Sequence, residues 1–275
     1  MAARPERVPA EEVRRRMLEA GRELAIEAGA ALTIEHLRVE EVIQRARVPR
    51  SSAYRMWPYR EEYIDDLLCY LAGAGNWFND RPVFDPETFT VLKQVVEDSR
   101  ELIGSLEGRR ALLREIVRLT VAQNYAALTE SGTWRLHMAL AATLGSTRTG
   151  EARQKIAAAL EESQRVSRDS LVAVFGFLAA ELGLRMHDPA ATIQHMLLAG
   201  GLLVQSMALR NVQVRAAADG DDAGEAALVD TLLNVPLPGP GLHGPPAEWT
   251  LAAFAFMGLV DAFIELDPDF TPPGR

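Results

Sequence analysis

Apolar residues recur every three or four positions along almost the whole chain, and this spacing constrains the fold more than any other feature. In segment 11–28, Val13, Met17 and Leu24 fall on one stripe of a helix. Strands with one face in a core would instead alternate apolar and polar residues, and little sustained alternation is present. No repeat of about 20–50 residues is visible, so a helical solenoid is not expected. The sequence therefore predicts an all-α fold.

Glycine and proline positions divide this pattern into separate predicted helices. Four come first, at 11–28, 39–46, 50–56 and 61–72. Longer ones follow at 86–105, 108–131, 134–144, 151–182, 189–216 and 248–265. Segments 218–224 and 236–246 are predicted loops, because the first is acidic and small and the second is rich in proline. Residues 267–275 are predicted to be a frayed tail.

The charge of the chain is unevenly distributed. The net charge is −9, which by itself does not favour binding to a polyanion. Residues 1–60, however, contain 12 basic and 9 acidic residues, whereas the remainder contains 17 basic and 29 acidic residues. A mildly basic end on an acidic body is compatible with a protein that presents that end to a nucleic acid.

Several functional classes are not favoured by the sequence. The single cysteine, Cys69, excludes an internal disulfide. The longest apolar runs, 171–184 and 196–209, are about 14 residues long, and a membrane span requires about 20. The N-terminus does not resemble a signal peptide, because Glu and Arg interrupt its apolar stretches. We therefore expect a cytoplasmic protein that does not enter a membrane.

Catalytic motifs are also missing from the sequence. We find no phosphate-binding glycine loop, no His-Glu-x-x-His, no Cys/His metal cluster and no Gly-x-Ser-x-Gly. The acidic pairs at 65–66 and 161–162 are neighbours in sequence, so on a helix their side chains point apart. We expect neither an enzyme nor a cofactor or metal.

The segment 39–63 carries the strongest functional signal. Two short predicted helices, 39–46 and 50–56, are joined by a three-residue turn, as in a helix-turn-helix. Ile43 and Ala46 are slim or small where the two helices must cross. On the second helix, Ala53 and Trp57 are expected to pack inward while polar residues face outward.

This segment resembles the DNA-binding part of the tetracycline-repressor (TetR) family, over about residues 13–71. The residues that match the family pattern are Val39, Val42, Ala46, Val48, Ser52, Tyr54 and Glu61, with Trp57 for the family's aromatic residue and Arg60 for its lysine. Two positions depart from the pattern. Arg47 stands where the family usually has glycine, which should cost about 1 kcal/mol if the turn needs positive φ. Met56 replaces the usual histidine or tyrosine.

The resemblance implies a set of DNA contacts: Arg38, Val39, Arg50, Ser51, Ser52, Tyr54, Arg55 and Arg60. Arg38 and Val39 would lie beside a phosphate, and Arg50 with the two serines would face base edges. Tyr54 and Arg60 would hold the DNA backbone, with Arg55 either joining them or forming a solvated charge on the helix surface. Arginine binds guanine through two parallel hydrogen bonds, whereas phosphate contacts set the position of the protein on the duplex.

The resemblance also implies two domains, a DNA-binding domain at 1–60 and a ligand-binding and dimerisation domain at 61–275. One helix-turn-helix contacts one half-site, so useful affinity generally requires two copies. The apolar segments 171–184, 196–209 and 251–264 are the predicted dimer surface. The alternative for these segments is that they form the core of a single subunit.

The resemblance further implies a ligand pocket among the helices at 86–144, where a few polar groups interrupt apolar stretches. The candidate residues are Gln123, Asn124, Tyr125, Trp134, His137 and Met138. The helix-turn-helix segment and its resemblance together imply a regulator of transcription, in the role of a repressor, that responds to a small-molecule effector and binds palindromic double-stranded DNA as a homodimer. The alternative is a helical protein-interaction module that does not bind DNA.

Overall fold

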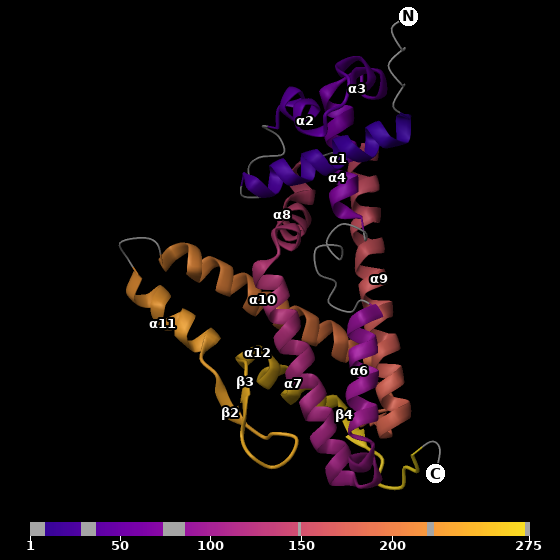
Figure 1. The fold of residues 1–275 in the computed structure, drawn as a ribbon, viewed down its shortest axis with the longest axis vertical. Coiled ribbons are helices and arrows are strands. Elements are labelled where there is room, and N and C mark those ends of the chain that lie inside the picture. Colours follow the sequence, from indigo (N-terminus) through magenta and orange to yellow (C-terminus); the bar gives the residue numbers. More distant parts are fainter. Residues whose placement is uncertain (1–8, 29–36, 74–85, 148–149, 219–222, 273–275) are drawn as a thin grey trace, which may run out of the picture. The chain divides into compact units, whose positions relative to one another are not determined.

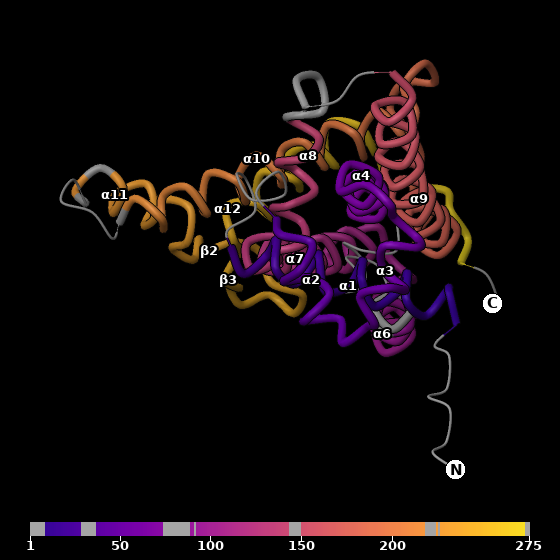
Figure 2. Tube along the Cα trace, turned by 90° about the horizontal axis from the view of Figure 1, so that it is seen from above, coloured from indigo at the N-terminus to yellow at the C-terminus, as the bar shows by residue number. Residues whose placement is uncertain are grey.

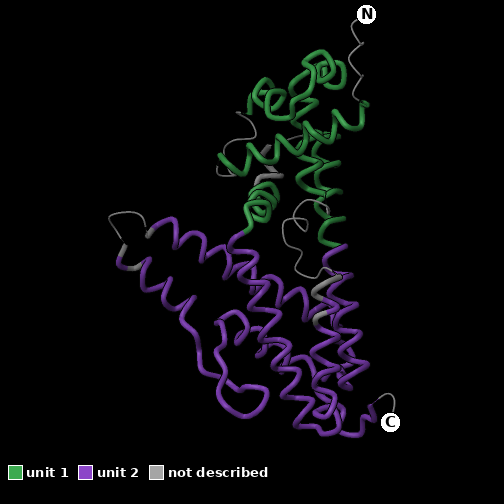
Figure 3. The backbone as a smooth tube through the Cα atoms, viewed as in Figure 1, with its two compact units in different colours: residues 1–80, 131–165 green, residues 81–130, 166–275 purple. Residues whose placement is uncertain are grey.

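A computed structural model describes residues 9–28, 37–73, 86–147, 150–218 and 223–272. These residues form eleven α-helices, one 3-10 helix and four strands of three residues each. The prediction that the fold is built from helices is therefore confirmed. The chain divides into two compact units, which are coloured separately in Figure 3. Unit 1 comprises residues 1–80 and 131–165, and unit 2 comprises residues 81–130 and 166–275.

Unit 1 contains the short N-terminal helices and one segment from later in the chain, residues 131–165 (Figure 1). Its helices are α1 (Ala10–Glu27), α2 (Val39–Ala46), α3 (Arg50–Met56), α4 (Arg60–Ala72), α8 (Gly132–Thr147) and the first part of α9 (Gly150–Leu182). The first four agree with the predicted helices to within one residue at each end. The predicted DNA-binding domain, 1–60, lies wholly within this unit.

The core of unit 1 is built around a close approach between α1 and α4. The hydroxyl of Tyr63 donates a hydrogen bond to the backbone oxygen of Met17 at 3.0 Å. A Cβ atom added at Gly21 would overlap that hydroxyl, so the contact requires glycine on α1. Trp57 packs edge-on against Tyr63, with ring centres 5.2 Å apart. The indole N–H of Trp57 donates to Asp66 Oδ2 at 3.0 Å, which satisfies the polar end of a buried ring.

The turn between α2 and α3 contains a left-handed residue. Arg47 has φ 52° and ψ 44°, and it is the one non-glycine residue with positive φ in the described part of the chain. Its amide donates to the backbone oxygen of Gln44 at 3.3 Å, and the amide of Val48 donates to Ile43 at 3.4 Å. The turn thus has a positive φ, the conformation that glycine adopts at least cost.

Unit 2 holds the longer helices and all four short strands. Its elements are α6 (Pro86–Asp98), η1 (Arg100–Gly104), α7 (Leu106–Glu130), the second part of α9, β1 (Leu184–Met186), α10 (Ile193–Ala218), α11 (Ala223–Asn234), β2 (Leu237–Gly239), β3 (Ala247–Trp249), α12 (Leu251–Phe263) and β4 (Ile264–Leu266). Strand β1 pairs antiparallel with β4, and β2 with β3. Helix α7 packs against both α10 and α12, and α11 folds back beside α10 (Figures 1 and 2).

Several predictions for unit 2 were wrong in detail. The predicted helix 86–105 is divided into α6 and η1. The predicted helix 189–216 begins at Ile193, because the amide of Ala190 binds the carboxylate of Asp188 at 2.8 Å in a turn. Helix α11 lies where no helix was predicted. The predicted loop at 236–246 has β2 near its start, paired with a strand that follows it.

The prediction of a frayed C-terminal tail was wrong for residues 267–272. Arg109, which is only 3% exposed, donates hydrogen bonds to the backbone oxygens of Leu182 and Asp267, each at 2.9 Å. The ring of Phe270 lies 5.0 Å from the Arg109 guanidinium. The same ring covers Gly183, where φ is 68° and a Cβ atom would overlap it. A buried arginine therefore ties this segment to the end of α9.

We predict that Arg47→Gly stabilises the protein by about 1 kcal/mol, because glycine adopts positive φ without the Cβ clash that arginine suffers. Urea unfolding would measure the change. The matched control is Arg55→Gly, an exposed arginine inside α3. There glycine should destabilise by about 0.5–1 kcal/mol, because the backbone is helical. Equal effects of the two substitutions would show that the left-handed turn stores no strain.

Candidate nucleic-acid interface and ligand cavity

Helix α3 has one buried side and one exposed side. Ala53 is 2% exposed and Trp57, which follows the helix, is 6% exposed, so both belong to the core of unit 1. Arg50, Ser51 and Arg55 are exposed. The structure therefore turns the polar side of α3 to solvent, as a helix that enters a DNA groove requires.

The other predicted DNA contacts lie on α2, α3 and α4 in the same unit. Arg38 precedes α2 and its side chain is 75% exposed, while Val39 is half-buried. Ser52 is half-buried and Tyr54 is 37% exposed. Arg60, the first residue of α4, donates to the backbone oxygen of Leu37 at 3.4 Å.

A carboxylate that the sequence analysis did not single out lies among these residues. Glu40 Oε1 accepts a hydrogen bond from the Tyr54 hydroxyl at 2.8 Å and lies 3.4 Å from Arg50 Nη2. The bond from Tyr54 lowers the pKa of Glu40, and the charges of Arg50 and Arg38 lower it further. Glu40 is therefore ionised at neutral pH. Its partners follow it by 10 and 14 residues, across the turn, so helical spacing gave no signal for this cluster.

Positive charge is concentrated near α3. Residues 38–60 contain six arginines and two glutamates, a net charge of +4. Two arginines of α1 are balanced by an acid on the same helix, since Arg15 and Arg16 lie 2.7 and 2.6 Å from Glu12. Helix α3 itself carries Arg50 and Arg55 and no acidic residue. This local positive charge attracts phosphate although the net charge of the whole chain is negative.

The six predicted ligand residues are divided between the two units. Gln123, Asn124 and Tyr125 lie on α7 in unit 2, whereas Trp134, His137 and Met138 lie on α8 in unit 1. Gln123 is exposed, and Met138 is half-buried. Tyr125, Trp134 and His137 are buried, and the hydroxyl of Tyr125 accepts from Asn211 Nδ2 at 2.6 Å.

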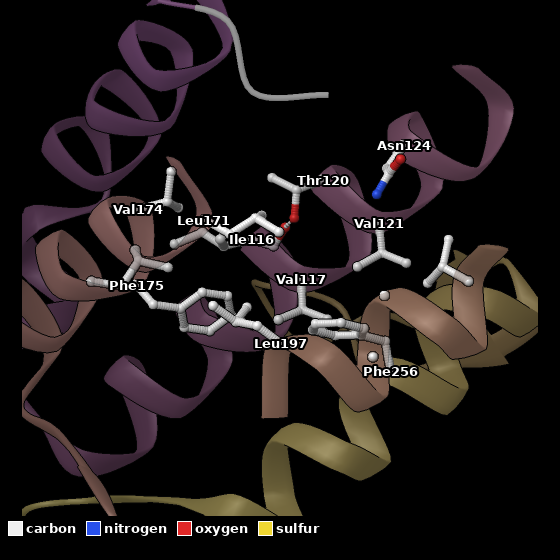
Figure 4. Close-up of a pocket in the computed structure, with 14 residues that line it drawn as sticks. Ile116, Val117, Thr120, Val121, Asn124, Leu171, Val174, Phe175, Leu197 and Phe256 are labelled. Atoms are coloured by element: carbon white, nitrogen blue, oxygen red, sulfur yellow. Dashed lines mark hydrogen bonds between the residues drawn. The ribbon is translucent and has the colours of Figure 1, made fainter. Parts of the chain in front are cut away.

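A cavity of about 60 Å³ lies within unit 2 (Figure 4). Its walls come from four helices: Ile116, Val117, Thr120, Val121 and Asn124 of α7, Leu171, Val174, Phe175 and Leu178 of α9, Leu197, Gly200, Gly201 and Val204 of α10, and Phe256 of α12. A single buried water requires only ~10–15 Å³, so there is room for a small apolar molecule. Of the six predicted ligand residues, Asn124 lines this cavity.

Two polar side chains interrupt the apolar wall. The hydroxyl of Thr120 donates to the backbone oxygen of Ile116 at 2.7 Å and keeps its lone pairs as acceptors. The amide oxygen of Asn124 is buried and accepts no hydrogen bond from the residues that the structure describes. A buried acceptor without a donor is costly. The cavity itself is lined mainly by apolar side chains and therefore suits a small, mostly apolar molecule.

Most cavity residues were missed because their segments were predicted to form the dimer surface. Phe175 of α9 and Val204 of α10 lie inside unit 2, as do Ala252 and Ala253 of α12. Gly200 allows the ring of Phe256 to approach α10, and a Cβ atom there would overlap that ring. One side of each segment therefore belongs to the core of a single subunit, the alternative left open by the sequence.

Comparison with models of known protein families, with curated proteins and with solved structures found no match for this chain. The resemblance to the tetracycline-repressor family stays a prediction that depends on the residues of the helix-turn-helix segment. Among the helices that the structure describes, none is long and apolar enough to cross a membrane.

We predict that the protein becomes less stable as the pH falls from 7.5 to 5. Burial lowers the pKa of His137, which is 2% exposed. The unfolded chain binds a proton near pH 6.5, whereas the folded chain resists it, so acid favours unfolding. Urea unfolding across this range should show a decline that His137→Gln reduces. The exposed His243 gives the matched control, and His243→Gln should keep the wild-type decline. An unchanged decline in His137→Gln would refute the assignment.

Proposed function

We propose that the protein is a ligand-responsive regulator of transcription, acting as a repressor, that binds palindromic operator DNA as a homodimer through α3. The observation that carries this proposal is the two-sided character of α3. Its inner side packs through Ala53 into the core, while Arg50, Ser51 and Arg55 face solvent next to α2.

The chemistry of the displayed residues suits a DNA duplex. Arg50 near the start of α3 has the geometry for two hydrogen bonds to guanine. Arg38 directly precedes α2, and Arg60 is the first residue of α4. In the proposal, both arginines contact phosphates of the DNA backbone. Tyr54 lies on the same surface and would contact a phosphate after its hydroxyl gives up its hydrogen bond to Glu40. Together they would supply both the base contact and the backbone contacts of one half-site.

A second copy of the chain would supply the other half-site. Helix α10 exposes Leu198 and Leu202, which are 59% and 57% exposed, and Leu209, which is 39% exposed. Phe254 on α12 is 48% exposed. Large apolar side chains grouped on one face mark association surfaces more often than single exposed ones do. In the proposal these residues lie between two subunits.

The cavity in unit 2 is the proposed effector site. Its apolar wall would select a small, mostly apolar molecule. Effector binding would change operator affinity only if it favours one conformation of the dimer, by about 1.4 kcal/mol for each tenfold loss of DNA affinity.

A second candidate function is a helical protein-interaction module that does not bind DNA. The observation that favours it is Glu40, whose negative charge neutralises Arg50 and occupies Tyr54 on the displayed surface. The net charge of −9 also opposes approach to DNA. Selection of bound fragments from a random DNA pool separates the two candidates, because an interaction module would enrich no sequence.

We predict that Arg50→Ala weakens binding to a selected DNA fragment by about 1–3 kcal/mol, roughly 5- to 150-fold, because a two-bond contact to guanine is lost. Fluorescence anisotropy with labelled fragments would measure the affinity, which should also fall with added salt. Arg153→Ala is the matched control, since it removes the same charge from an exposed position on α9 in unit 1. Wild-type affinity in Arg50→Ala would exclude the assigned role of α3.

We predict that Gly201→Val weakens the binding of small apolar ligands by about 1–3 kcal/mol, because the new side chain occupies cavity space. A Cβ atom at Gly201 meets open space, so the backbone tolerates the change. Thermal shifts with indole and short-chain alcohols and amides would report binding. Gly258→Val is the control, because Gly258 is exposed on α12 and also has open space around it. The cavity assignment fails if both variants bind a ligand as the wild type does.

A further inference from the structure

Glu40 joins the start of α2 to α3 through side-chain contacts on the displayed surface. Its Oε1 atom lies 2.8 Å from the Tyr54 hydroxyl and 3.4 Å from Arg50 Nη2. The Arg50 guanidinium lies 5.4 Å from the centre of the Tyr54 ring. These three residues form a closed set, which we call the Glu40 cluster. The proposed DNA contacts use two of its members and leave the carboxylate without a role.

A carboxylate meets few compatible groups on DNA. Phosphates repel it, and most major-groove atoms of the bases are acceptors that cannot pair with it. The exceptions are amino groups, above all the N4 amino group of cytosine, which glutamate and aspartate accept from. An arginine has the opposite preference and binds the O6 and N7 atoms of guanine. An arginine and a glutamate in contact therefore match a guanine and a cytosine that are neighbours.

We propose that Glu40 determines the base preference of this helix-turn-helix. It would accept a hydrogen bond from a cytosine in the base pair adjacent to the one whose guanine Arg50 binds. The inference rests on the proposed function, because it requires α3 to enter DNA. On the matching sequence, the cytosine amino group replaces the Tyr54 hydroxyl as the donor to Glu40. Tyr54 is then released to contact a phosphate.

The same carboxylate opposes binding to other sequences. Where no amino group meets it, Glu40 keeps its charge beside the phosphates and finds no donor on the DNA. Arg50 and Tyr54 must also give up their contacts with Glu40 before they bind the backbone. Non-specific DNA is therefore disfavoured by repulsion and because no base donor replaces the hydrogen bond that Glu40 loses from Tyr54. This would raise the ratio of specific to non-specific affinity beyond what the contact with cytosine supplies.

Fragment selection from a random DNA pool tests the inference with four proteins: the wild type, Glu40→Ala, Glu41→Ala and Arg50→Ala. Arg50→Ala identifies the guanine, because its enrichment is lost in that variant. Glu40→Ala should keep the guanine and lose the adjoining cytosine. Glu41 is the matched control, because it neighbours Glu40 on α2, is 55% exposed and pairs with Arg38 at 3.7 Å. Glu41→Ala should retain both bases.

A second measurement follows affinity for DNA of unrelated sequence at several salt concentrations. Glu40→Ala should bind this DNA more tightly, up to about eightfold in 0.1 M salt, because one opposing charge is removed from the interface. The slope of log affinity against log salt should steepen by up to about one. Circular dichroism should show wild-type helicity in every variant, since both glutamates are exposed.

The outcomes separate this inference from the proposed function. If the wild type enriches a sequence but Glu40→Ala enriches the same cytosine, the base preference does not come from Glu40 and the inference is overturned alone. Equal loss of cytosine in Glu40→Ala and Glu41→Ala would also overturn it, because the effect would be one of general charge. If the wild type enriches no sequence, the proposed function and this inference fail together.

Discussion

The packing of Trp57 against Tyr63 decides which side of α3 faces solvent. Trp57 directly follows α3, and its indole N–H donates a hydrogen bond to Asp66 on α4. Tyr63 in turn reaches α1 through its bond to the backbone of Met17, an approach that Gly21 makes possible. Helices α1, α3 and α4 are thus held together by two aromatic rings whose polar atoms each make a hydrogen bond. The outward direction of Arg50 and its neighbours is a consequence of this inner contact, because a helix that buries one side must display the other.

The turn before α3 shows a conflict between backbone conformation and surface chemistry. A left-handed residue is needed there to bring α2 and α3 together within three residues, and glycine would adopt that conformation at least cost. The chain instead places Arg47, an exposed positive charge, beside the surface formed by Arg50 and Arg55. The φ of 52° at the end of α2 is a common way to terminate a helix, and arginine occupies it at greater cost than glycine would.

The short helices of unit 1 could be predicted from the sequence because their limits are set locally. Pro58 and Gly73 follow α3 and α4 closely, and the apolar stripes between such positions have the helical period. The C-terminal segment could not be predicted in this way, since it is held by Arg109, which lies 158 residues before Asp267. The exposure of α3 followed from periodicity, but Glu40 did not, because its partners come from another helix. The cavity residues escaped for a different reason: an apolar residue that lines a cavity has the same sequence pattern as one that fills a core.

Helix α10 shows why apolar character alone could not separate a core from an association surface. Leu197 and Val204 face the cavity, whereas Leu198 and Leu202 are exposed on another side of the same helix. Apolar residues lie on both sides of α10, so the sequence of the segment shows no difference between the side that faces the cavity and the side that faces solvent. This arrangement bears on the proposed regulation. A molecule that enters the cavity contacts α10 directly, and a shift of α10 would displace the exposed leucines with it. In the proposed dimer built on those leucines, a small movement of α10 at the interface is a physical means by which effector binding would change the positions of the two proposed DNA-binding helices.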